Sequence, residues 1–350
     1  MDVSQGLQHA DKKSEEPGRL KRSTMSDVAR RAGVSKATVS HVINHTRFVE
    51  TETKERVLQA IAELDYRPNA AARSLTTNRT GSIGMVISDS TNLFFGEMLR
   101  GVEDILRPQN YSLIVCNTDE VLERESHYLD LLLSQPVDGI IAAATSQPWS
   151  ALAEAEVEHT PIVFVDRAYD PQAQPFVGVN NYQGAYLGAK HLLERGHRQI
   201  GIVAGLQRLS TMRERVAGFC QALDEAGVPA NEDWIIPCEL SIEAARTVTR
   251  QLLTAPARPT ALFLNNNLLS LGALLALRDL ALHCPADIAL VGFDDHPWAA
   301  VSDPPLTVIS QPARQVGQVA AQLLYDLLHD HAPERLRVVL DCELIVREST

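Results

Sequence analysis

The sequence predicts a small all-α N-terminal domain followed by an α/β core of two subdomains with parallel sheets. Apolar residues recur at helical spacing through residues 24–64, and from Gly81 onward short β-rich runs alternate with amphipathic helices. Such alternation is typical of parallel strands joined by helical crossovers. The second part, about 270 residues long, is too long for one sheet and suits two subdomains facing each other across a cleft.

The composition is that of a globular chain. It has 350 residues, of which 45% are hydrophobic and 22% charged, which excludes collagen-like, disordered and coiled-coil proteins. The most apolar helical stretch, residues 268–280, is shorter than the ~18 residues of a membrane span. The N-terminus lacks the apolar core of a secretory signal. We therefore expect a cytoplasmic protein without a membrane partner.

The cysteines point to a reducing compartment. Their number is odd and no C-x-x-C pair occurs among them, so we expect reduced thiols and neither a disulfide framework nor a zinc site. The five are Cys116, Cys220, Cys238, Cys284 and Cys342.

The charge is unevenly distributed. The net charge is −12, yet residues 19–80 contain twelve basic and six acidic residues. Residues 1–18 contain two basic and four acidic residues, which leaves −16 for residues 81–350. A basic head on an acidic body predicts a separate nucleic-acid-binding module.

The head begins after a polar segment, residues 1–22, that we expect to be a disordered tail. Thr24 and Asp27 have the spacing of a capping box, which predicts the start of a helix. Gly33 interrupts that helix, and Ser35 can cap a second one. The buried side of the second helix is expected to comprise Val39, Val42 and Ile43.

A third amphipathic helix is expected over residues 51–64, with Val57, Leu58, Ile61 and Leu64 at helical spacing. The segment 67–69 ends it. The alanine-rich segment 70–75 has high helix propensity but too few turns to be stable alone. We expect it to fold only when another surface, such as DNA, supports it.

The core elements follow from the alternation of patterns. Strands are expected at residues 83–87, 112–116, 139–143, 161–165, 200–204, 261–264 and 288–293. Helices are expected between them at residues 97–106, 123–133, 183–194, 213–226 and 244–253.

The segment MSDVARRAGVSKATVSHVIN, residues 25–44, predicts a helix-turn-helix, whose second helix enters the major groove of DNA. The outward face of that helix carries Lys36, Ala37, Ser40 and His41. An ordinary pair of core helices would show the same periodicity. The basic charge of the head favours DNA binding.

Residues 24–80 resemble the DNA-binding domain of the lactose-repressor (LacI/GalR) family of bacterial transcription regulators. SHVINHTRFV, residues 40–49, is especially similar to the purine and ribose repressors, and YRPNAAARSL, residues 66–75, continues the match. The resemblance implies that residues 23–68 form a helix-turn-helix domain and residues 69–80 a hinge helix and linker. It also implies a homodimer bound to a pseudo-palindromic double-stranded DNA operator.

The resemblance further implies which residues contact DNA. Lys36, Ala37 and His41 would read bases, and a leucine matching Leu75 would wedge into a base step of the minor groove. A linker leucine packed on the core is the alternative for Leu75. The full expected set is Thr24, Ser35, Lys36, Ala37, Thr38, Ser40, His41, Asn44, Arg47, Asn69 and Leu75.

Most of residues 81–350 resembles the effector-binding core of the same family, which has the fold of periplasmic sugar-binding proteins. The matching motifs include TNLFFGEMLRGVE, ERGHRQIGIVAG and VGFDD. The resemblance implies a cleft between an N-subdomain and a C-subdomain. Their expected ranges are about 81–180 with 312–337, and about 181–311 with 338–350.

The resemblance places a small-molecule effector in that cleft. Phe94 and Phe95 would form an aromatic wall, and Arg215, with Arg213 beside it, would bond ligand oxygens. Leu240 stands where the purine repressor has an aromatic ring, which makes a purine less expected. The expected effector residues are Phe94, Phe95, Arg167, Thr211, Arg213, Arg215, Leu240, Asn267 and Asp294.

Asn267 departs from the purine and ribose repressors, which carry an aspartate at this place. Losing a carboxylate while keeping arginines makes the cleft less negative, which favours a sugar acid or sugar phosphate over a neutral pentose. The alternative is that the asparagine bonds the same ligand hydroxyls.

Catalysis has no candidate residues. The sequence contains no G-x-G-x-x-G, P-loop, G-x-S-x-G or H-E-x-x-H motif, so neither an enzyme nor a cofactor is expected. The segments 294–296 and 329–331 contain histidine and aspartate but lack the spacing of a metal site. A periplasmic sugar-binding protein would share the core fold but would need a signal peptide and no basic head. We therefore expect a ligand-controlled transcription regulator, without the heptad tail of a tetramer.

Overall fold

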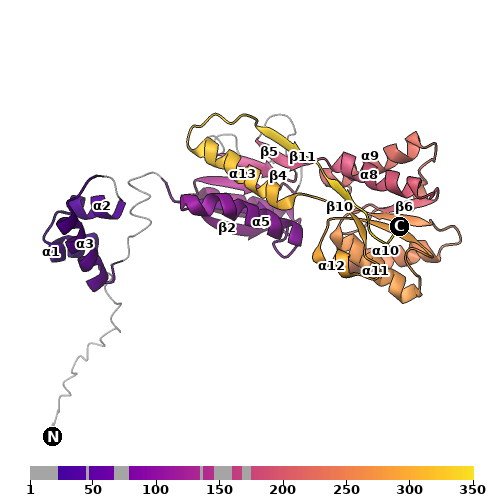
Figure 1. Cartoon of the computed structure of the whole chain (residues 1–350), viewed down its shortest axis with the longest axis horizontal. Helices are drawn as coiled ribbons and strands as arrows, with labels where there is room; N and C mark the ends of the chain where they lie inside the picture. Colours follow the sequence, from indigo (N-terminus) through magenta and orange to yellow (C-terminus); the bar gives the residue numbers. More distant parts are fainter. Residues whose placement is uncertain (1–22, 45–46, 67–78, 135–136, 146–159, 168–174) are drawn as a thin grey trace, which may run out of the picture. The chain divides into compact units, whose positions relative to one another are not determined.

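The computed structural model describes residues 23–44, 47–66, 79–134, 137–145, 160–167 and 175–350. The chain divides into two compact units, Met1–Arg79 and Thr80–Thr350 (Figure 1). This division lies one residue before the expected start of the core. The expected N-terminal tail, Asn69 and Leu75 lie outside the described residues.

The N-terminal unit contains the three predicted helices, α1 (Met25–Ala32), α2 (Lys36–Asn44) and α3 (Thr51–Glu63). The capping box is confirmed: the Asp27 backbone N–H donates to the Thr24 hydroxyl, and the Thr24 N–H donates to the Asp27 carboxylate at 3.0 Å. Gly33 ends α1 with φ of 69°, a left-handed conformation that glycine adopts without strain.

The core of this unit is formed by apolar side chains from all three helices, with Val28, Val39 and Val57 fully buried. The expectation for Leu58 is wrong, because its side chain is 48% exposed. Ala60 is buried instead. The positions 57, 60, 61 and 64 follow the i, i+3, i+4, i+7 spacing of one helix face, from which position 58 deviates.

The described strands of the second unit form two six-stranded sheets, one in each subdomain. The first has the order β11-β5-β4-β3-β1-β2 with every pair parallel. Its strands are β1 (Ser82–Ile87), β2 (Ser112–Asn117), β3 (Gly139–Ala142), β4 (Ile162–Val165), β5 (Phe176–Val179) and β11 (Arg337–Leu340).

The second sheet has the order β12-β10-β9-β8-β6-β7, and its single antiparallel pair is β10 with β12. Its strands are β6 (Ile200–Val203), β7 (Ile235–Ile236), β8 (Ala261–Leu264), β9 (Ala289–Phe293), β10 (Thr307–Ser310) and β12 (Glu343–Ile345). All seven predicted strands of the two sheets are confirmed. The five that were not predicted are short or lack a clear apolar run.

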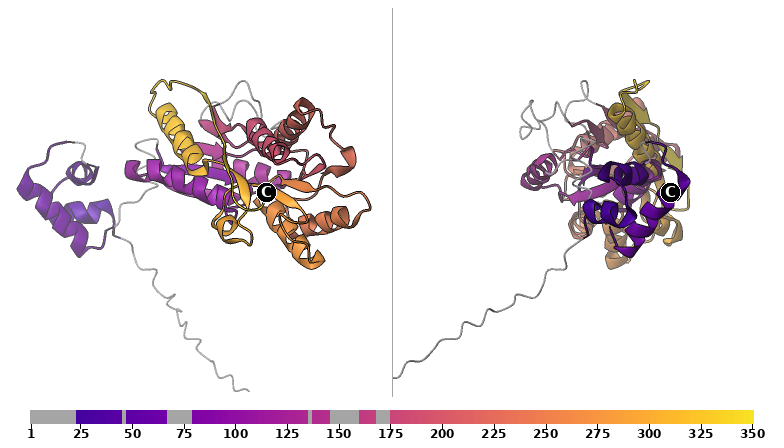
Figure 2. Two further views of the ribbon diagram at one scale, coloured as in Figure 1. Left: turned by 45° about the vertical axis from the view of Figure 1, so that its right-hand side comes forward. Right: turned by 90° about the vertical axis from the view of Figure 1, so that its left-hand side faces the viewer.

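Helices cover both faces of each sheet (Figures 1 and 2). In the first subdomain α5 (Leu93–Leu106) and α13 (Ala313–Leu328) lie side by side, and α6 (Leu122–Ser134) packs on the opposite face. In the second, α8 (Asn181–Glu194) and α9 (Ser210–Glu225) cover one face, and α10 (Ile242–Thr254) and α11 (Asn267–Leu280) the other. The five predicted core helices are confirmed. The remaining short elements are η1 (Arg107–Gln109), η2 (Glu232–Trp234) and α12 (Pro297–Val301).

The chain passes between the two subdomains after β5, after β10 and after β11. The expected boundary at residue 337 is therefore placed too early, because β11 pairs with β5 in the first sheet through Leu340. The last strand, β12, then joins the second sheet.

Candidate functional site

A cavity of about 230 Å³ lies between the two subdomains of the second unit. Its polar lining comes from the carboxyl ends of strands in both sheets, the place where parallel sheets bind ligands. Ser88 follows β1, Asp166 follows β4, Asn266 follows β8 and Asp294 follows β9. The cavity therefore collects side chains from distant parts of the sequence.

Seven of the nine expected effector residues line this cavity. They are Phe94, Phe95, Arg167, Thr211, Arg215, Leu240 and Asp294. Phe94 and Phe95 meet edge to face, with ring centroids 5.1 Å apart, and supply the predicted aromatic surface.

The structure does not bring Arg213 and Asn267 into the lining. The exposed Arg213 guanidinium donates to the carbonyl oxygens of Gln207 at 3.1 Å and Arg208 at 2.8 Å. Residues two apart on a helix do not share a face, so Arg213 points away when Arg215 points inward. Asn267 is buried behind the lining, to which its neighbour Asn266 contributes.

Arg215 is fixed by partners within the second subdomain. It is 3% exposed, and its Nε donates to Asn181 Oδ1 at 2.8 Å while Nη1 donates to the Asn265 carbonyl at 2.6 Å. Its guanidinium carbon lies 3.6 Å from the centre of the Phe293 ring. Burial lowers the pKa of Arg215, and nearby carboxylates oppose this effect.

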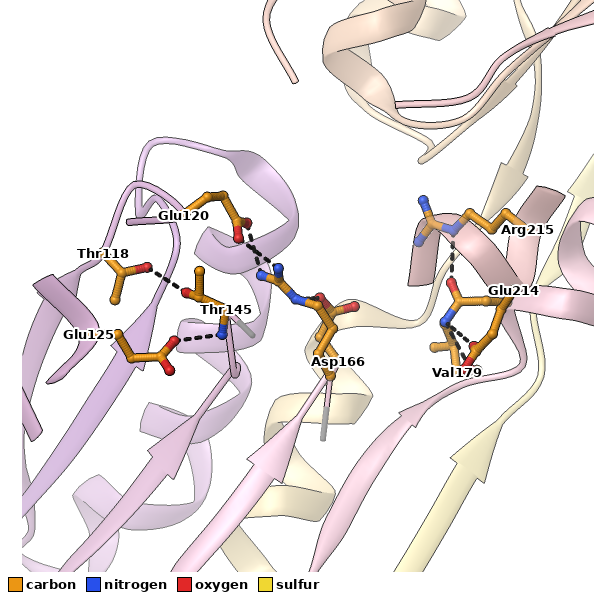
Figure 3. A network of polar contacts seen from close by, with 10 residues as sticks. Thr118, Glu120, Glu125, Thr145, Asp166, Val179, Glu214 and Arg215 are labelled. Atoms are coloured by element: carbon orange, nitrogen blue, oxygen red, sulfur yellow. Dashed lines mark hydrogen bonds and ion pairs between the residues drawn. The ribbon is translucent and has the colours of Figure 1, made fainter. Parts of the chain in front are cut away.

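Arg167 forms a buried ion pair with Glu120 at the other side of the cavity (Figure 3). Nη1 and Nη2 donate to the two carboxylate oxygens at 2.7 and 2.9 Å, and Nε lies 3.2 Å from Asp166 Oδ2. Burial opposes the charge of Arg167, but Glu120 and Asp166 raise its pKa above the ordinary value. Burial also raises the pKa of Asp166, against the attraction of Arg167.

A group of buried polar contacts lies near this ion pair, and the charge of Glu125 helps to raise the pKa of Arg167. The carboxylate of Glu125, which is 1% exposed, accepts a hydrogen bond of 2.5 Å from the backbone N–H of Thr145 at the end of β3 (Figure 3). The hydroxyls of Thr145 and Thr118 lie 3.4 Å apart. Buried polar groups linked in this way hold the strand ends in fixed positions.

Several lining residues were not predicted from the sequence. They include Asp89, Asn92, Asp119, Glu120, Asp166, Asn266 and Gln311.

Four acidic lining residues have left-handed backbone conformations, with φ of 50° at Asp119, 59° at Glu120, 60° at Asp166 and 82° at Asp294. Such conformations cluster at functional sites. Their position one to three residues after a strand was the sequence signal that could have identified them.

The cavity is rich in carboxylates, even though Asn267 takes the place of an aspartate in the purine and ribose repressors. Five carboxylates and two guanidiniums line it. Asp89, Asp119 and Glu120 come from loops after β1 and β2, and no pattern around Asn267 could reveal them. Both guanidiniums already have protein acceptors.

The N-terminal unit presents the expected DNA-contacting residues on and around α2. Lys36, Ala37, Asn44 and Arg47 are exposed, and Ser40 and His41 are half-buried. Ser35 caps α2 by accepting from the Thr38 N–H at 3.1 Å. The inward residues Val39 and Val42 are buried as predicted, so the opposite face of α2 is available for contact.

Each of the two units matches a known protein family. Residues 24–69 match the family described as bacterial regulatory proteins, lacI family. Residues 80–347 match the family described as periplasmic binding proteins and sugar binding domain of the LacI family, and this match covers more than half of the chain. The chain belongs to the LacI family.

Relatives of this LacI-family protein match it over almost its full length. The transcriptional repressor PurR of Aliivibrio salmonicida (strain LFI1238) is 39% identical over 328 residues, 93% of this chain and 98% of that protein. The lac repressor dimer bound to operator and the anti-inducer ONPF has a TM-score of 0.85 at 30% identity, covering 94% of this chain and 99% of its own. A LacI-family regulator from Enterococcus faecium with bound ribose has a TM-score of 0.68 at 30% identity, covering 77% of this chain and 98% of that chain.

These findings make the LacI-family chain a DNA-binding transcription regulator and not an enzyme. Its all-α head and its two parallel-sheet subdomains are the fold that the sequence predicts. In the part of the chain that the structure describes, no helix is both long and apolar enough to cross a membrane.

Proposed function

We propose that this regulator represses transcription from a pseudo-palindromic operator as a homodimer, and that a small neutral ligand rich in hydrogen-bond donors controls it. A monosaccharide is the ligand class that the cavity supports best. The observation that carries this proposal is that the lining holds five carboxylates and only two guanidiniums. Protein groups engage the carboxylates as well as the guanidiniums, but each carboxylate oxygen can accept more than one hydrogen bond. Ligand hydroxyls can donate to carboxylates without bringing a second negative charge.

The size and shape of the cavity support a single ring. Its volume of about 230 Å³ lies below the ~300–1,000 Å³ of pockets for drug-sized ligands. Phe94 and Phe95 supply an apolar surface for one ring face. A LacI-family relative with bound ribose shows this fold holding a pentose.

A sugar acid or sugar phosphate fits the charges less well. An anion in this cavity would lie among Asp89, Asp119, Asp166 and Asp294, and like charges at short range are costly in a partly buried site. A purine base is the second candidate, because the PurR relative is 39% identical and the ring N–H groups of a purine can donate to carboxylates. Leu240 in the lining supplies no aromatic ring for stacking.

Thermal-shift measurements with ribose, gluconate, ribose 5-phosphate and hypoxanthine separate these classes. We expect ribose or another neutral monosaccharide to stabilise the full-length protein, by about 2.7 kcal/mol at 100 times its Kd. Stabilisation by the two anions alone would reject the neutral-ligand proposal. Stabilisation by hypoxanthine alone would establish the second candidate.

The DNA-binding part of the proposal rests on α2 and on the basic head. Lys36, Ala37 and His41 are the proposed base-reading residues on this helix. The other proposed contacts are Thr24, Ser35, Thr38, Ser40, Asn44 and Arg47, with Asn69 and Leu75 outside the described residues. A regulator that binds the bacterial chromosome acts in the cytoplasm. Gel shifts with genomic fragments at several salt concentrations test it, and binding that is neither sequence-selective nor salt-dependent would contradict it.

Two apolar surfaces support the homodimer. The first includes Ile114 and Val115 on the edge strand β2, which are 41% and 39% exposed. Val121 and Leu122, at the start of α6, are 37% and 41% exposed. In the second subdomain a groove of about 480 Å³ is lined by leucines of α11. The lac repressor, a structural relative, is a dimer, and we propose that a second copy of this chain covers both surfaces.

The mechanism follows from linkage between the two sites. A ligand that prefers one relative position of the subdomains changes the population of that position. If the two positions differ in affinity for operator, ligand and DNA affinities change by the same factor. The cavity between the subdomains is suited to this role because both of them contribute to its lining.

A further inference from the structure

Asn267 joins the two subdomains through its side-chain amide. It is the first residue of α11 in the second subdomain and is 4% exposed. Its Nδ2 donates to Oδ1 of Asn92 at 3.0 Å and to Oδ2 of Asp294 at 3.1 Å. Asn92 caps α5 in the first subdomain, so the first of these hydrogen bonds crosses the cleft.

The same amide fixes how two lining side chains face the cavity. Asn92 Oδ1 accepts from the Phe94 N–H at 3.1 Å as well as from Asn267, so its remaining polar group is the Nδ2 donor. Asp294 Oδ2 accepts from both the backbone N–H and the Nδ2 of Asn267, and Oδ1 accepts from Gln311 Nε2. Asn92 is thereby left with a donor, and Asp294 is held as an oriented acceptor.

A second hydrogen bond crosses the cleft at a different place. Nη2 of Arg208, in the loop before α9, donates to the backbone carbonyl of Glu120 at 3.2 Å. This bond does not involve Asn267 or its partners. Direct hydrogen bonds therefore join the two subdomains at two separate points.

We propose that Asn267 is a positioning residue that couples closure of the cleft to the orientation of Asn92 and Asp294. The proposal rests on the proposed function, in which the effector occupies this cavity. The position needs two donors, because Asn92 Oδ1 and Asp294 Oδ2 are both acceptors, and an amide NH2 group supplies them without adding a charge. A carboxylate at this position would lose both bonds and would face Asp294 at about the 3.1 Å that now separates the amide from it.

Two substitutions separate positioning from simple packing. Asn267→Ala removes both side-chain bonds at any pH. Asn267→Asp also removes them near neutral pH, but at lower pH the new carboxyl group and Asp294 can share one proton, which restores the bond to Asp294 and not the bond to Asn92. Only the Asp variant should therefore recover on acidification, and only on the Asp294 side.

Other titratable groups near this position are present in every variant, so their own titration is common to the proteins compared. Asp166 and Arg215 interact electrostatically with Asp294. Further charged or titratable groups near Asp294 are Glu97, Asp295, His296 and Arg314, together with Cys342, which interacts electrostatically with Asp294. Asn231→Asp is a matched control, because Asn231 is an exposed N-cap of η2 outside the cavity lining.

Hydrogen–deuterium exchange of the full-length protein without added ligand tests the proposal. Rates corrected for intrinsic exchange are compared in two segments, 92–98 and 267–272. At about pH 8 we expect both Asn267 variants to exchange at least about fivefold faster in both segments, which is the effect of one lost hydrogen bond. At about pH 5 the Asp variant should return towards the wild-type rate in segment 267–272 but stay fast in segment 92–98, while the Ala variant stays fast in both. The Asn231→Asp control should match the wild type at both pH values.

Two outcomes would overturn the proposal. Faster exchange confined to 267–272 would show that Asn267 only stabilises its own helix. Equal behaviour of the Ala and Asp variants at both pH values would show that donor capacity has no role. Binding of ribose is tested separately, by thermal shift on the wild-type protein. A lack of stabilisation by ribose would count against the proposed effector class. The exchange result would still decide the role of Asn267.

Discussion

The guanidinium of Arg167 binds the carboxylate of Glu120 through two parallel hydrogen bonds of 2.7 and 2.9 Å. Their side chains are 4% and 16% exposed, so the pair is largely removed from water. It connects the residues after β4 to the loop after β2 and, through the Glu120 carbonyl, to Arg208 of the second subdomain. The pair thus forms part of the cavity wall and part of the contact between the subdomains.

Glu120→Gln should destabilise the protein by about 3 kcal/mol, because it leaves the guanidinium of Arg167 buried without its main counter-charge. Equilibrium denaturant unfolding measures this change. Arg124→Ala is the control, since Arg124 pairs with Asp119 where both side chains are more than half exposed, and it should change stability by no more than about 0.5 kcal/mol. Equal effects of the two substitutions would show that burial of the Arg167 pair has no energetic consequence.

Asp166→Asn should change how stability depends on pH. Burial raises the pKa of Asp166 in the folded state above its ordinary value of 3.8. Protonated Asp166 therefore stabilises the folded protein below pH 3.8. This stabilisation is lost as the pH rises through the pKa of Asp166 in the folded state. The amide cannot ionise, and asparagine tolerates the left-handed conformation found here, with φ of 60°.

The gain in melting temperature from Asp166→Asn should therefore be larger at about pH 8 than at about pH 4. Thermal unfolding of both proteins across this range measures it. A gain that shrinks as the pH rises would contradict the raised pKa.

Two glycines of α5 should respond to alanine in opposite ways. A Cβ on Gly101 would lie 2.0 Å from the backbone carbonyl oxygen of Arg314 in α13, so the two packed helices would have to separate. Gly101→Ala should cost about 2 kcal/mol or more. A Cβ on Gly96 would meet only the Ser90 carbonyl, at 3.9 Å, and Gly96→Ala should stabilise the protein by about 0.5 kcal/mol. Chemical denaturation of both variants checks the sign of each change.

Lys36→Ala should weaken DNA binding without affecting the fold. Lys36 is exposed at the start of α2, so its removal should leave the unfolding free energy within about 0.5 kcal/mol of the wild type. Operator affinity should fall by about 1–3 kcal/mol if Lys36 reads a base. Lys54→Ala in α3 removes the same charge from an exposed position outside the proposed contact set. Equal losses in the two variants would indicate a non-specific charge effect.

Local patterns predicted much of this fold. Three predicted features each depend on only a few neighbouring residues, and the structure reproduces them. They are the capping box at Thr24, the glycine after α1 and the apolar spacing of α2. The predicted strands were those with continuous apolar runs. The position of β11 was missed because its pairing with β5 depends on a segment more than 150 residues away.

The site was predictable only in part. The resemblance identified Phe94, Arg215 and Asp294 because motifs carry them. Two other residues that it implied, Arg213 and Asn267, lie next to the lining in the sequence: Arg213 is two positions from Arg215, and Asn267 is one position from Asn266. Side chains one or two positions apart on a helix point in different directions. The expectation from Asn267 concerned one position, and the acidic residues in the loops after β1 and β2 lie outside any motif around it.

Composition, periodicity and contiguous motifs were enough to predict the family, the basic head and acidic core, and the order of the elements. The meeting of acidic residues after β1, β2, β4 and β9 in one cavity is visible only in the folded protein. So is the hydrogen bond from Asn267 across the cleft to Asn92. Charge balance and hydrogen-bond pairing depend on distances between side chains, and folding brings together residues that no local pattern connects.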